Sequence, residues 1–199
     1  MDERILEAAL RVFAESGYRG ATTRRIAAEA GINEVTLFRH FNTKEALIVA
    51  ALEHHAGRMR AMLAAHRLPD EPSDVRAELT AYLEFIMQAT IASERAHRTA
   101  LGEWGQHPEI DAQQAQTSAA IFNEVHRYIS AARERGLIRS DASDAAITRA
   151  LLGMIFADVL VRPTLPEFYT EDPAAAARLY CSMLFDGILA PGASDATKD

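Results

Sequence analysis

The stretch that decides the fold runs from residue 21 to residue 45 and reads ATTRRIAAEAGINEVTLFRHFNTKE. Thr22 and Asn33 stand where helix N-caps are expected, and Gly31 stands where a helix ends in a left-handed residue. The pattern predicts helices over 23–30 and 34–40 joined by a tight turn, both too short to be stable without backing. The apolar residues that recur at helical spacing and are expected to face inward are Ile26, Ala27, Ala30, Leu37 and Phe41.

One face of the helix predicted over 34–40 is expected to stay free when the helices pack. It carries Glu34, Val35, Thr36, Phe38 and Arg39. A short exposed helix with mixed polar and apolar groups fits the major groove of DNA. The segment therefore predicts a helix-turn-helix, backed by a helix over 3–16 and by the start of a helix over 44–66.

The rest of the chain is also predicted to be helical, which makes the fold class all-α with about nine helices. No strand-like alternation persists over more than a few residues. Glycine and proline mark the breaks, at Gly17, Gly136 and in the Pro69–Pro72 and Pro163–Pro166 segments. The further helices are expected over 73–93, 94–105, 109–135, 144–161 and 173–189.

Composition excludes several classes of protein. The 199 residues are 49% hydrophobic and 25% charged, which is typical of a folded globular chain. No apolar run reaches the roughly 18 residues of a membrane span, and the first residues lack the pattern of a signal peptide. The single cysteine, Cys181, excludes an internal disulfide, so we expect a reducing, cytoplasmic setting.

Charge is unevenly distributed along the chain. The formal net charge is −7, yet residues 18–44 hold five basic and two acidic side chains. A local basic patch can meet phosphate even on an acidic protein. An ordinary solvated face explains the charge equally well, so charge alone does not decide between them.

Residues 3–55 resemble the DNA-binding domain of the TetR family of bacterial repressors. The family pattern is a helix followed by T-T-x-x-I-A-x-x-A-G-V-S-x-x-T-L-Y-x-H-F-x-x-K-E-x-L. Such a dense match over about 25 residues is highly specific. The matching residues are Thr22, Thr23, Ile26, Ala27, Ala30, Gly31, Thr36, Leu37, His40, Phe41, Lys44, Glu45 and Leu47.

The resemblance implies a helix-turn-helix domain over 1–47, a ligand-binding and dimerisation domain over 48–190, and a flexible tail over 191–199. Glu34 and Val35 would read base edges, Phe38 would touch sugar, and Lys44 would hold a phosphate. The other DNA contacts that the resemblance implies, mainly to phosphate and sugar, are Thr22, Thr23, Arg24, Arg25, Thr36 and His40.

The segment departs from the family pattern at four positions. Asn33 replaces a serine and still caps well, and Val35 replaces a small residue. Glu34 replaces a lysine or glutamine and would repel phosphate unless it faces a base. Phe38 replaces a tyrosine and lacks the hydroxyl that touches phosphate. These changes bear on contact strength and on operator sequence, not on the fold.

Residues 144–161 and 178–189 are apolar nearly all the way round, which indicates helices with neighbours on several sides. The resemblance implies that these last two helices pair with their copies in a homodimer. A two-fold axis would then place two recognition helices about 34 Å apart on a palindromic operator. A core buried within one chain is the alternative.

The middle helices would enclose a pocket for a small-molecule effector of unknown identity. A pocket needs apolar walls and a few placed polar groups. Plain core packing is the alternative for each residue. The candidate ligand-binding residues are Met59, Met62, Tyr82, Phe85, Met87, Trp104, His107, Phe122 and His126.

The sequence therefore predicts a ligand-responsive DNA-binding regulator, most simply a repressor, although activators share such folds. The histidine and cysteine spacings fit no metal site, no cofactor is expected, and Cys181 has no resolving partner. Motifs of hydrolases and phosphate-binding loops are missing, so an enzyme is not expected. The remaining alternative is a helical interaction module with weak or lost DNA binding, controlled by a protein partner.

Overall fold

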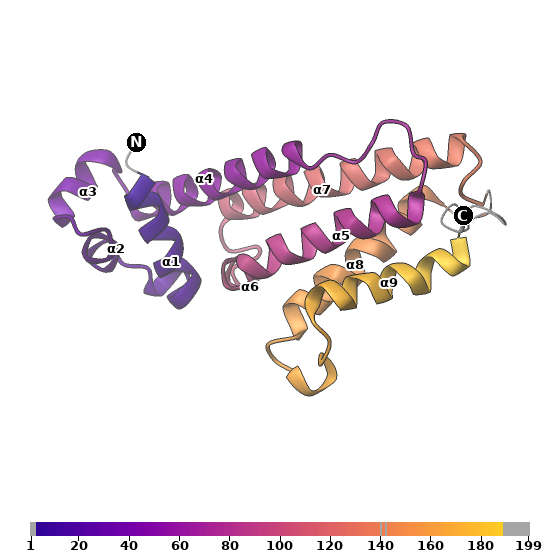
Figure 1. Ribbon diagram of the computed structural model, residues 1–199. Helices are drawn as coiled ribbons and strands as arrows, with labels where there is room; N and C mark the ends of the chain where they lie inside the picture. The colour runs from indigo at the N-terminus through magenta and orange to yellow at the C-terminus, as the bar shows by residue number, and fades with distance from the viewer. Residues whose placement is uncertain (1–2, 140, 142, 189–199) are drawn as a thin grey trace. The chain divides into compact units, whose positions relative to one another are not determined.

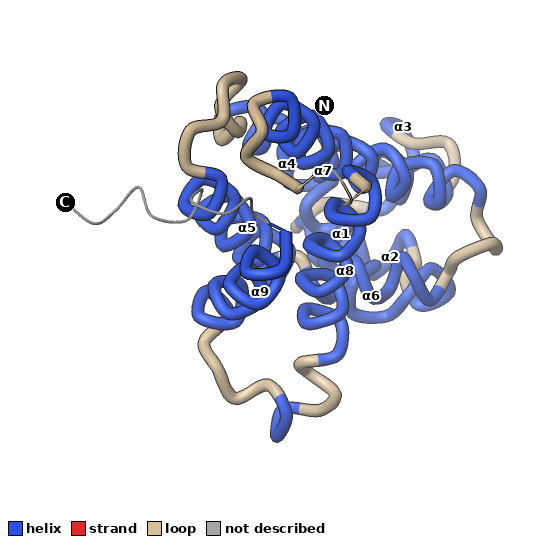
Figure 2. Tube along the Cα trace, turned by 90° about the vertical axis from the view of Figure 1, so that its right-hand side faces the viewer, coloured by secondary structure: helices blue, strands red, loops and turns tan. Residues whose placement is uncertain are grey.

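The computed structural model describes residues 3–139, 141 and 143–188, so the predicted tail over 191–199 lies outside the described residues. Within these ranges the chain forms helices and loops without a strand, as Figure 2 shows. The predicted all-α fold with about nine helices is confirmed. The elements in order are α1 (Glu3–Gly20), α2 (Thr23–Ala30), α3 (Glu34–His40), α4 (Lys44–Ala65), α5 (Val75–Ala92), α6 (Glu94–Gly102), α7 (Pro108–Glu134), α8 (Asp144–Val161), η1 (Pro166–Phe168) and α9 (Pro173–Ile188).

Side-chain caps explain why several helices begin where they do. The Thr43 hydroxyl accepts a hydrogen bond from the Ala46 N–H at 3.0 Å at the start of α4. The Asp74 carboxylate accepts one from the Ala77 N–H at 2.9 Å at the start of α5. Each bond satisfies a donor that the first helical turn leaves without a partner. The predicted starts at these helices are therefore correct to within one or two residues.

Helix α1 continues past the glycine that was expected to end it. Gly17 adopts a φ of 68° and kinks the helix, and the Ala21 N–H then donates to the Gly17 carbonyl at 3.0 Å. Glycine is suited to this left-handed backbone because it has no Cβ. The chain therefore forms one more helical turn after the kink, and Tyr18 lies in this turn.

The chain divides into two compact units. The first unit holds residues 1–64 and 93–119, and the second holds residues 65–92 and 120–199. Helices α1–α4 and α6 thus group with the first turns of α7, while α5, α8 and α9 group with the rest of α7. The domain boundary predicted at residue 47 stays a prediction.

The first unit is built around the inner face of α1. Helix α1 packs against α2 and α6, and α2 packs against α3. The residues expected to face inward on α2 and α3 do so: Ile26 and Leu37 are fully buried, and Ala27 and Phe41 nearly so. Ala30 lies partly buried at the edge of the same core.

In the second unit α5 packs against both α8 and α9. Figure 1 shows α8 and α9 running in opposite directions beside α5. Leu83 of α5, Leu151 of α8 and Phe185 of α9 are buried. Because these side chains come from three different helices, part of the apolar surface of α8 and α9 is buried within a single chain.

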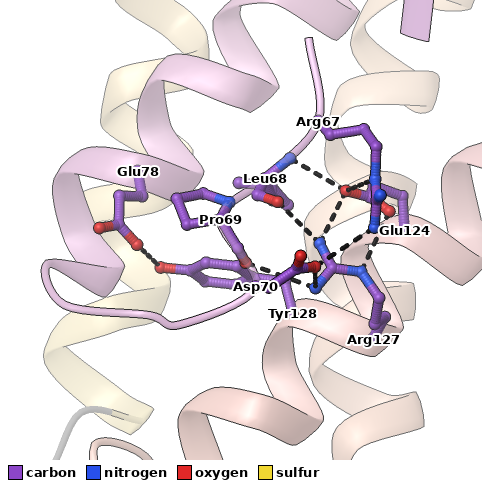
Figure 3. Close-up of polar contacts among 8 residues, drawn as sticks. All are labelled: Arg67, Leu68, Pro69, Asp70, Glu78, Glu124, Arg127 and Tyr128. Atoms are coloured by element: carbon purple, nitrogen blue, oxygen red, sulfur yellow. Dashed lines mark hydrogen bonds and ion pairs between the residues drawn. The ribbon is translucent and has the colours of Figure 1, made fainter. Parts of the chain in front are cut away.

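Arg127 of α7 forms hydrogen bonds that hold the loop between α4 and α5 in place (Figure 3). Its guanidinium donates to the Glu124 carboxylate and to the Leu68 carbonyl, both at 2.8 Å, and to Asp70 at 3.1 Å. Glu124 also accepts from the Leu68 N–H at 2.9 Å. Burial alone would raise the pKa of Glu124, but the hydrogen bonds and charge of Arg127 outweigh burial and lower it.

We expect Arg127→Met to lower the free energy of unfolding by about 2 kcal/mol at pH 7, because Glu124 is left without its charged partner. Since the pKa of Glu124 is lower in the folded state, this stabilisation is present at neutral pH. It is lost as the pH falls below about 4 and through the folded-state pKa. Urea denaturation at several pH values measures both effects.

The matched control is Arg135→Met, which removes an exposed arginine whose distance to Glu71 is 3.7 Å. We expect it to change the free energy of unfolding by less than about 0.5 kcal/mol. Equal losses in the two variants, or a difference that does not shrink in acid, would contradict the role given to Arg127.

Candidate nucleic-acid interface

Local hydrogen bonds fix the geometry of α2, the turn and α3. The Thr22 hydroxyl accepts from the Arg25 N–H at 3.3 Å, and the Asn33 side chain accepts from the Val35 N–H at 2.9 Å. Gly31 has a φ of 68°, and its N–H donates to the Ala28 carbonyl at 3.1 Å. The predicted caps and turn are therefore confirmed, and they hold α2 and α3 at a defined angle.

The outer face of α3 exposes two large apolar side chains. Val35 is 76% exposed and Phe38 is 46% exposed, whereas Leu37 between them is fully buried. Because Leu37 anchors the inner face, Val35 and Phe38 are held outward on a short helix. An exposed face of this kind can be inserted into a groove.

The predicted DNA-contact residues all lie on α2, α3 and the residues that begin α2 and α4, so the structure brings them onto adjoining elements of one unit. Thr22, Arg24 and His40 are exposed, and Thr36 is half-buried. Arg25 is also exposed but is partly engaged, because it donates to the Gly20 carbonyl at 3.2 Å. Their contacts with DNA stay a prediction.

Thr23 and Glu34 contact each other directly. The Thr23 hydroxyl donates to the Glu34 Oε1 atom at 2.6 Å, and this bond joins the first residue of α2 to the first residue of α3. Both residues are half-buried. The sequence pattern predicts each residue separately on the DNA side and does not predict their contact.

Three arginines on α1–α3 are exposed and make no ion pair within the part of the chain that the structure describes. They are Arg19, Arg24 and Arg39. Only Arg24 was among the predicted DNA contacts. Arg19 follows the Gly17 kink and Arg39 lies in the last turn of α3, so their proximity to the helix-turn-helix was readable from the sequence.

Lys44, expected to hold a phosphate, has a partner inside the protein. Its ammonium donates to the Tyr18 carbonyl at 2.8 Å and lies 4.0 Å from the centroid of the Tyr18 ring. An ammonium has three N–H donors, so this bond leaves donors for another acceptor. Lys44 therefore connects the start of α4 with the kinked end of α1.

Tyr18 is held from the other side by the segment between α6 and α7. The Tyr18 N–H donates to Glu103 Oε1 at 3.0 Å, and the Tyr18 and His107 rings have centroids 3.8 Å apart. Burial, and then the nearby acidic groups Glu45, Glu109 and Glu103, raise the pKa of Tyr18. We call Tyr18, Lys44, Glu103 and His107 the Tyr18 joint.

The predicted ligand-binding residues are divided between the two units. Met59, Met62, Trp104 and His107 belong to the first unit, and the others to the second. Trp104 is 58% exposed, and His107 is part of the Tyr18 joint.

In the second unit the aromatic candidates form contacts in pairs. Phe85 stacks on His66 with ring centroids 4.2 Å apart, and Phe122 stacks on His126 at 5.7 Å. Tyr82 is buried beside Phe85, and Met87 is fully buried. The Tyr82 hydroxyl and His126 Nδ1 are buried without a hydrogen-bond partner among the described residues. Buried polar atoms beside aromatic side chains are what a ligand site requires, and ligand binding stays a prediction.

A polar cavity in the first unit was not predicted. It has a volume of about 20 Å³ and is lined by residues of α4, α6 and α7, among them His55, His97 and Gln113. His55 Nε2 and Gln113 Oε1 are buried without a hydrogen-bond partner in the described part of the chain. Burial, and then His97 and Arg58, lower the pKa of His55. The cavity has room for about one water molecule.

The described residues hold no cluster of three or more histidine, cysteine, aspartate or glutamate side chains able to bind a metal. No helix in the described ranges has both the length and the apolar character needed to cross a membrane. Cys181 of α9 is buried, and burial raises the pKa of its thiol to about 11.

The sequence similarity to known proteins lies mainly in the helix-turn-helix. Residues 5–51 match the model of a family described as bacterial regulatory proteins, tetR family. The transcriptional repressor AcnR of Corynebacterium diphtheriae is 40% identical over 75 residues, which cover 38% of this chain and 40% of AcnR. The chain spans 33% and 40% of the length of the first two curated relatives.

Solved structures share the fold over nearly the whole chain. SmeT, the repressor of the Stenotrophomonas maltophilia multidrug efflux pump SmeDEF, has a TM-score of 0.72 at 20% identity, covering 100% of this chain and 96% of SmeT. A further SmeT structure is a complex with triclosan. FadR of Bacillus subtilis in complex with stearoyl-CoA has a TM-score of 0.73 at 18% identity, covering 92% of this chain and 97% of FadR.

These two structural matches show the fold alone, because their sequence identity is low. The match of residues 5–51, the dense motif and the capped α2–α3 pair carry the assignment. On these observations, residues 5–51 of the chain form a helix-turn-helix domain of the TetR family of bacterial regulatory proteins.

Proposed function

We propose that the chain is a transcriptional regulator that binds a palindromic operator as a homodimer and, as a repressor, is released by a small-molecule effector. The observation that carries the DNA-binding part is the outer face of α3. Val35 and Phe38 are exposed there while Leu37 fixes the inner face. Exposed apolar side chains on a short helix can pack against base edges and sugars in a major groove.

The proposed contacts separate into base-reading and backbone-binding groups. Glu34 and Val35 meet base edges, where a valine methyl packs on a thymine methyl. Arg24, Arg19 and Arg39 meet phosphates, because their guanidinium groups are exposed and unpaired among the described residues. The remaining proposed contacts, to phosphate or sugar, are Thr22, Thr23 through its backbone N–H, Arg25, Thr36, Phe38, His40 and Lys44.

We expect Arg24→Ala and Lys44→Ala each to reduce the slope of log affinity against log salt concentration by about one, for every duplex alike. Each variant removes one cation from the phosphate surface. Fluorescence anisotropy measures this with labelled duplex from upstream of the chain's own gene, with bulk DNA as competitor. Lys44→Ala is also expected to melt at a lower temperature, because the Tyr18 carbonyl loses its partner.

The control is Arg135→Ala, which removes an exposed arginine of the second unit and leaves the slope unchanged. A slope that does not change in Arg24→Ala would refute its phosphate contact. If the unsubstituted protein is folded and dimeric yet shows no salt-dependent binding to any duplex, the alternative of an interaction module controlled by a protein partner replaces the proposed function.

The proposed dimer uses α8 and α9. On α9, Leu179 is 48% exposed and Met183 is 66% exposed, and residues four apart share one face of a helix. Cys181 and Phe185 cover the buried side of the same helix. The exposed apolar face supports packing against the same helix of a second chain, and a two-fold axis would set the two α3 helices about one DNA turn apart.

We expect the double substitution Leu179→Glu with Met183→Glu to convert the dimer to a monomer at micromolar concentration, because charge cannot be buried in an apolar interface. Analytical ultracentrifugation measures the mass, and circular dichroism checks that the helices are retained. Gln88→Glu, at an exposed position of α5, is the control and stays dimeric. A wild-type monomer, or a double variant that remains dimeric, would refute this interface.

The effector is proposed to bind beside the buried polar atoms of the second unit that lack a partner among the described residues, the Tyr82 hydroxyl and His126 Nδ1, which lie next to the rings of Phe85 and Phe122. The complexes of SmeT with triclosan and of FadR with stearoyl-CoA support a largely apolar small molecule. Release of labelled duplex by added compounds identifies such a ligand. The Tyr18 joint is proposed to transmit binding to α1 and α4, because its four residues join the α6–α7 segment to both helices.

A further inference from the structure

We infer that Thr23 is a positioning residue for operator specificity, because its hydroxyl holds the Glu34 carboxylate as a fixed acceptor for the exocyclic amino group of cytosine. The inference rests on the proposed function, DNA binding through α3. Its starting point is the 2.6 Å hydrogen bond from the Thr23 hydroxyl to Glu34 Oε1. A bond of this length is typical of a hydroxyl that donates to a carboxylate.

The two residues sit at points that the backbone holds rigidly. Thr23 is the first residue of α2 and Glu34 is the first residue of α3. The Gly31 turn links the helices, and the Ile32 N–H donates back to the Ala27 carbonyl at 3.0 Å. Because these backbone bonds restrain both helix starts, the hydroxyl and the carboxylate are held within reach of each other.

Counting donors shows what the bond does to each side chain. A threonine hydroxyl has one hydrogen, and here Glu34 accepts it. While the bond lasts, the Thr23 side chain cannot donate to a phosphate. Glu34 keeps its second carboxylate oxygen, Oε2, and an ionised carboxylate can only accept. The pair therefore presents one acceptor in a fixed place at the start of the proposed recognition helix.

A fixed acceptor distinguishes the four bases in the major groove. Cytosine offers an N4 amino donor, and adenine offers an N6 donor beside the N7 acceptor. Guanine offers O6 and N7 acceptors and thymine offers O4, which a carboxylate oxygen would repel. Cytosine is therefore preferred, adenine is second, and guanine and thymine are rejected.

Rejection requires that the carboxylate stay in place. An unrestrained glutamate has several rotamers and would turn into solvent when it meets a base acceptor. It would then lose the penalty against guanine and thymine and also part of the preference for cytosine. The Thr23 bond removes this freedom, so selectivity depends on a residue that itself need not touch a base.

The test begins with a randomised duplex library selected by the full-length protein. The base position that responds to Glu34→Ala is identified, and affinities are measured for all four bases at that position. We expect the wild type to prefer cytosine by about tenfold over guanine and thymine. Glu34→Gln should shift the preference to adenine, because glutamine pairs with adenine N6 and N7.

Thr23→Val keeps the shape of the side chain but removes the hydroxyl, and we expect it to reduce the cytosine preference to about twofold, because the acceptor is no longer held in place. Thr23→Ser keeps the hydroxyl and should restore the wild-type preference. The salt slope and the melting temperature of Thr23→Val should match the wild type, since Thr22, not Thr23, caps α2. A purely structural role for Thr23 would instead lower the melting temperature and leave the base preference unchanged.

The outcomes separate this inference from the proposed function. Enrichment of a sequence, with full cytosine preference retained in Thr23→Val or in Glu34→Gln, overturns the positioning role and leaves DNA binding intact. Failure of the folded wild-type dimer to enrich any duplex overturns the proposed function, and the inference falls with it. Loss of preference in Thr23→Val with rescue by Thr23→Ser supports both.

Discussion

The backbone N–H and the backbone carbonyl of Tyr18 each bond to a charged side chain, and the arrangement of the first unit depends on these two bonds. Its N–H donates to Glu103 and its carbonyl accepts from Lys44. Gly17 turns the backbone just before Tyr18, so that both groups are available at the end of α1. Helix α1, the start of α4 and the segment after α6 therefore meet at one point. Helix α2 packs on α1 and α3 packs on α2, so the direction of α3 depends on the position of α1.

Local features of the sequence were sufficient for most of the fold. The caps at Thr22, Asn33 and Thr43 form the expected hydrogen bonds because a cap joins residues only two or three apart. Leu37 and Phe41 are buried because helical periodicity fixes which face they occupy. Such features depend on neighbours along the chain, and a single sequence displays these neighbours directly.

Contacts between distant segments were not predictable in the same way. Lys44 lies 26 residues from Tyr18, and Glu103 lies 85 residues from it, so no spacing rule relates them. The motif alone gives Lys44 a role toward phosphate, and its internal partner appears only in the structure. The bond between Thr23 and Glu34 was likewise missed, because the turn that brings two helix starts together sets distances that periodicity does not contain.

The position of the candidate ligand-binding residues likewise depends on contacts between distant helices. Trp104 is a natural pocket candidate as the chain's one tryptophan, yet it is exposed in a turn after α6. His55 and Gln113 carry buried atoms without a partner among the described residues, at the cavity in the first unit, although their sequence pattern is that of a helix surface. Composition identifies which side chains suit a pocket, but packing between helices decides which of them face one.

Because Cys181 is buried, a cysteine introduced on the surface of this protein can be labelled selectively. Cys181 is the chain's single cysteine, and a thiol with a pKa of about 11 is almost entirely protonated at neutral pH, where only thiolates react with maleimides. A cysteine introduced at exposed Ala28 of α2 would therefore take up a spin label or fluorophore alone, without removal of the native thiol. Two identical probes in a dimer would report the separation of its two helix-turn-helix segments in solution as a single distance.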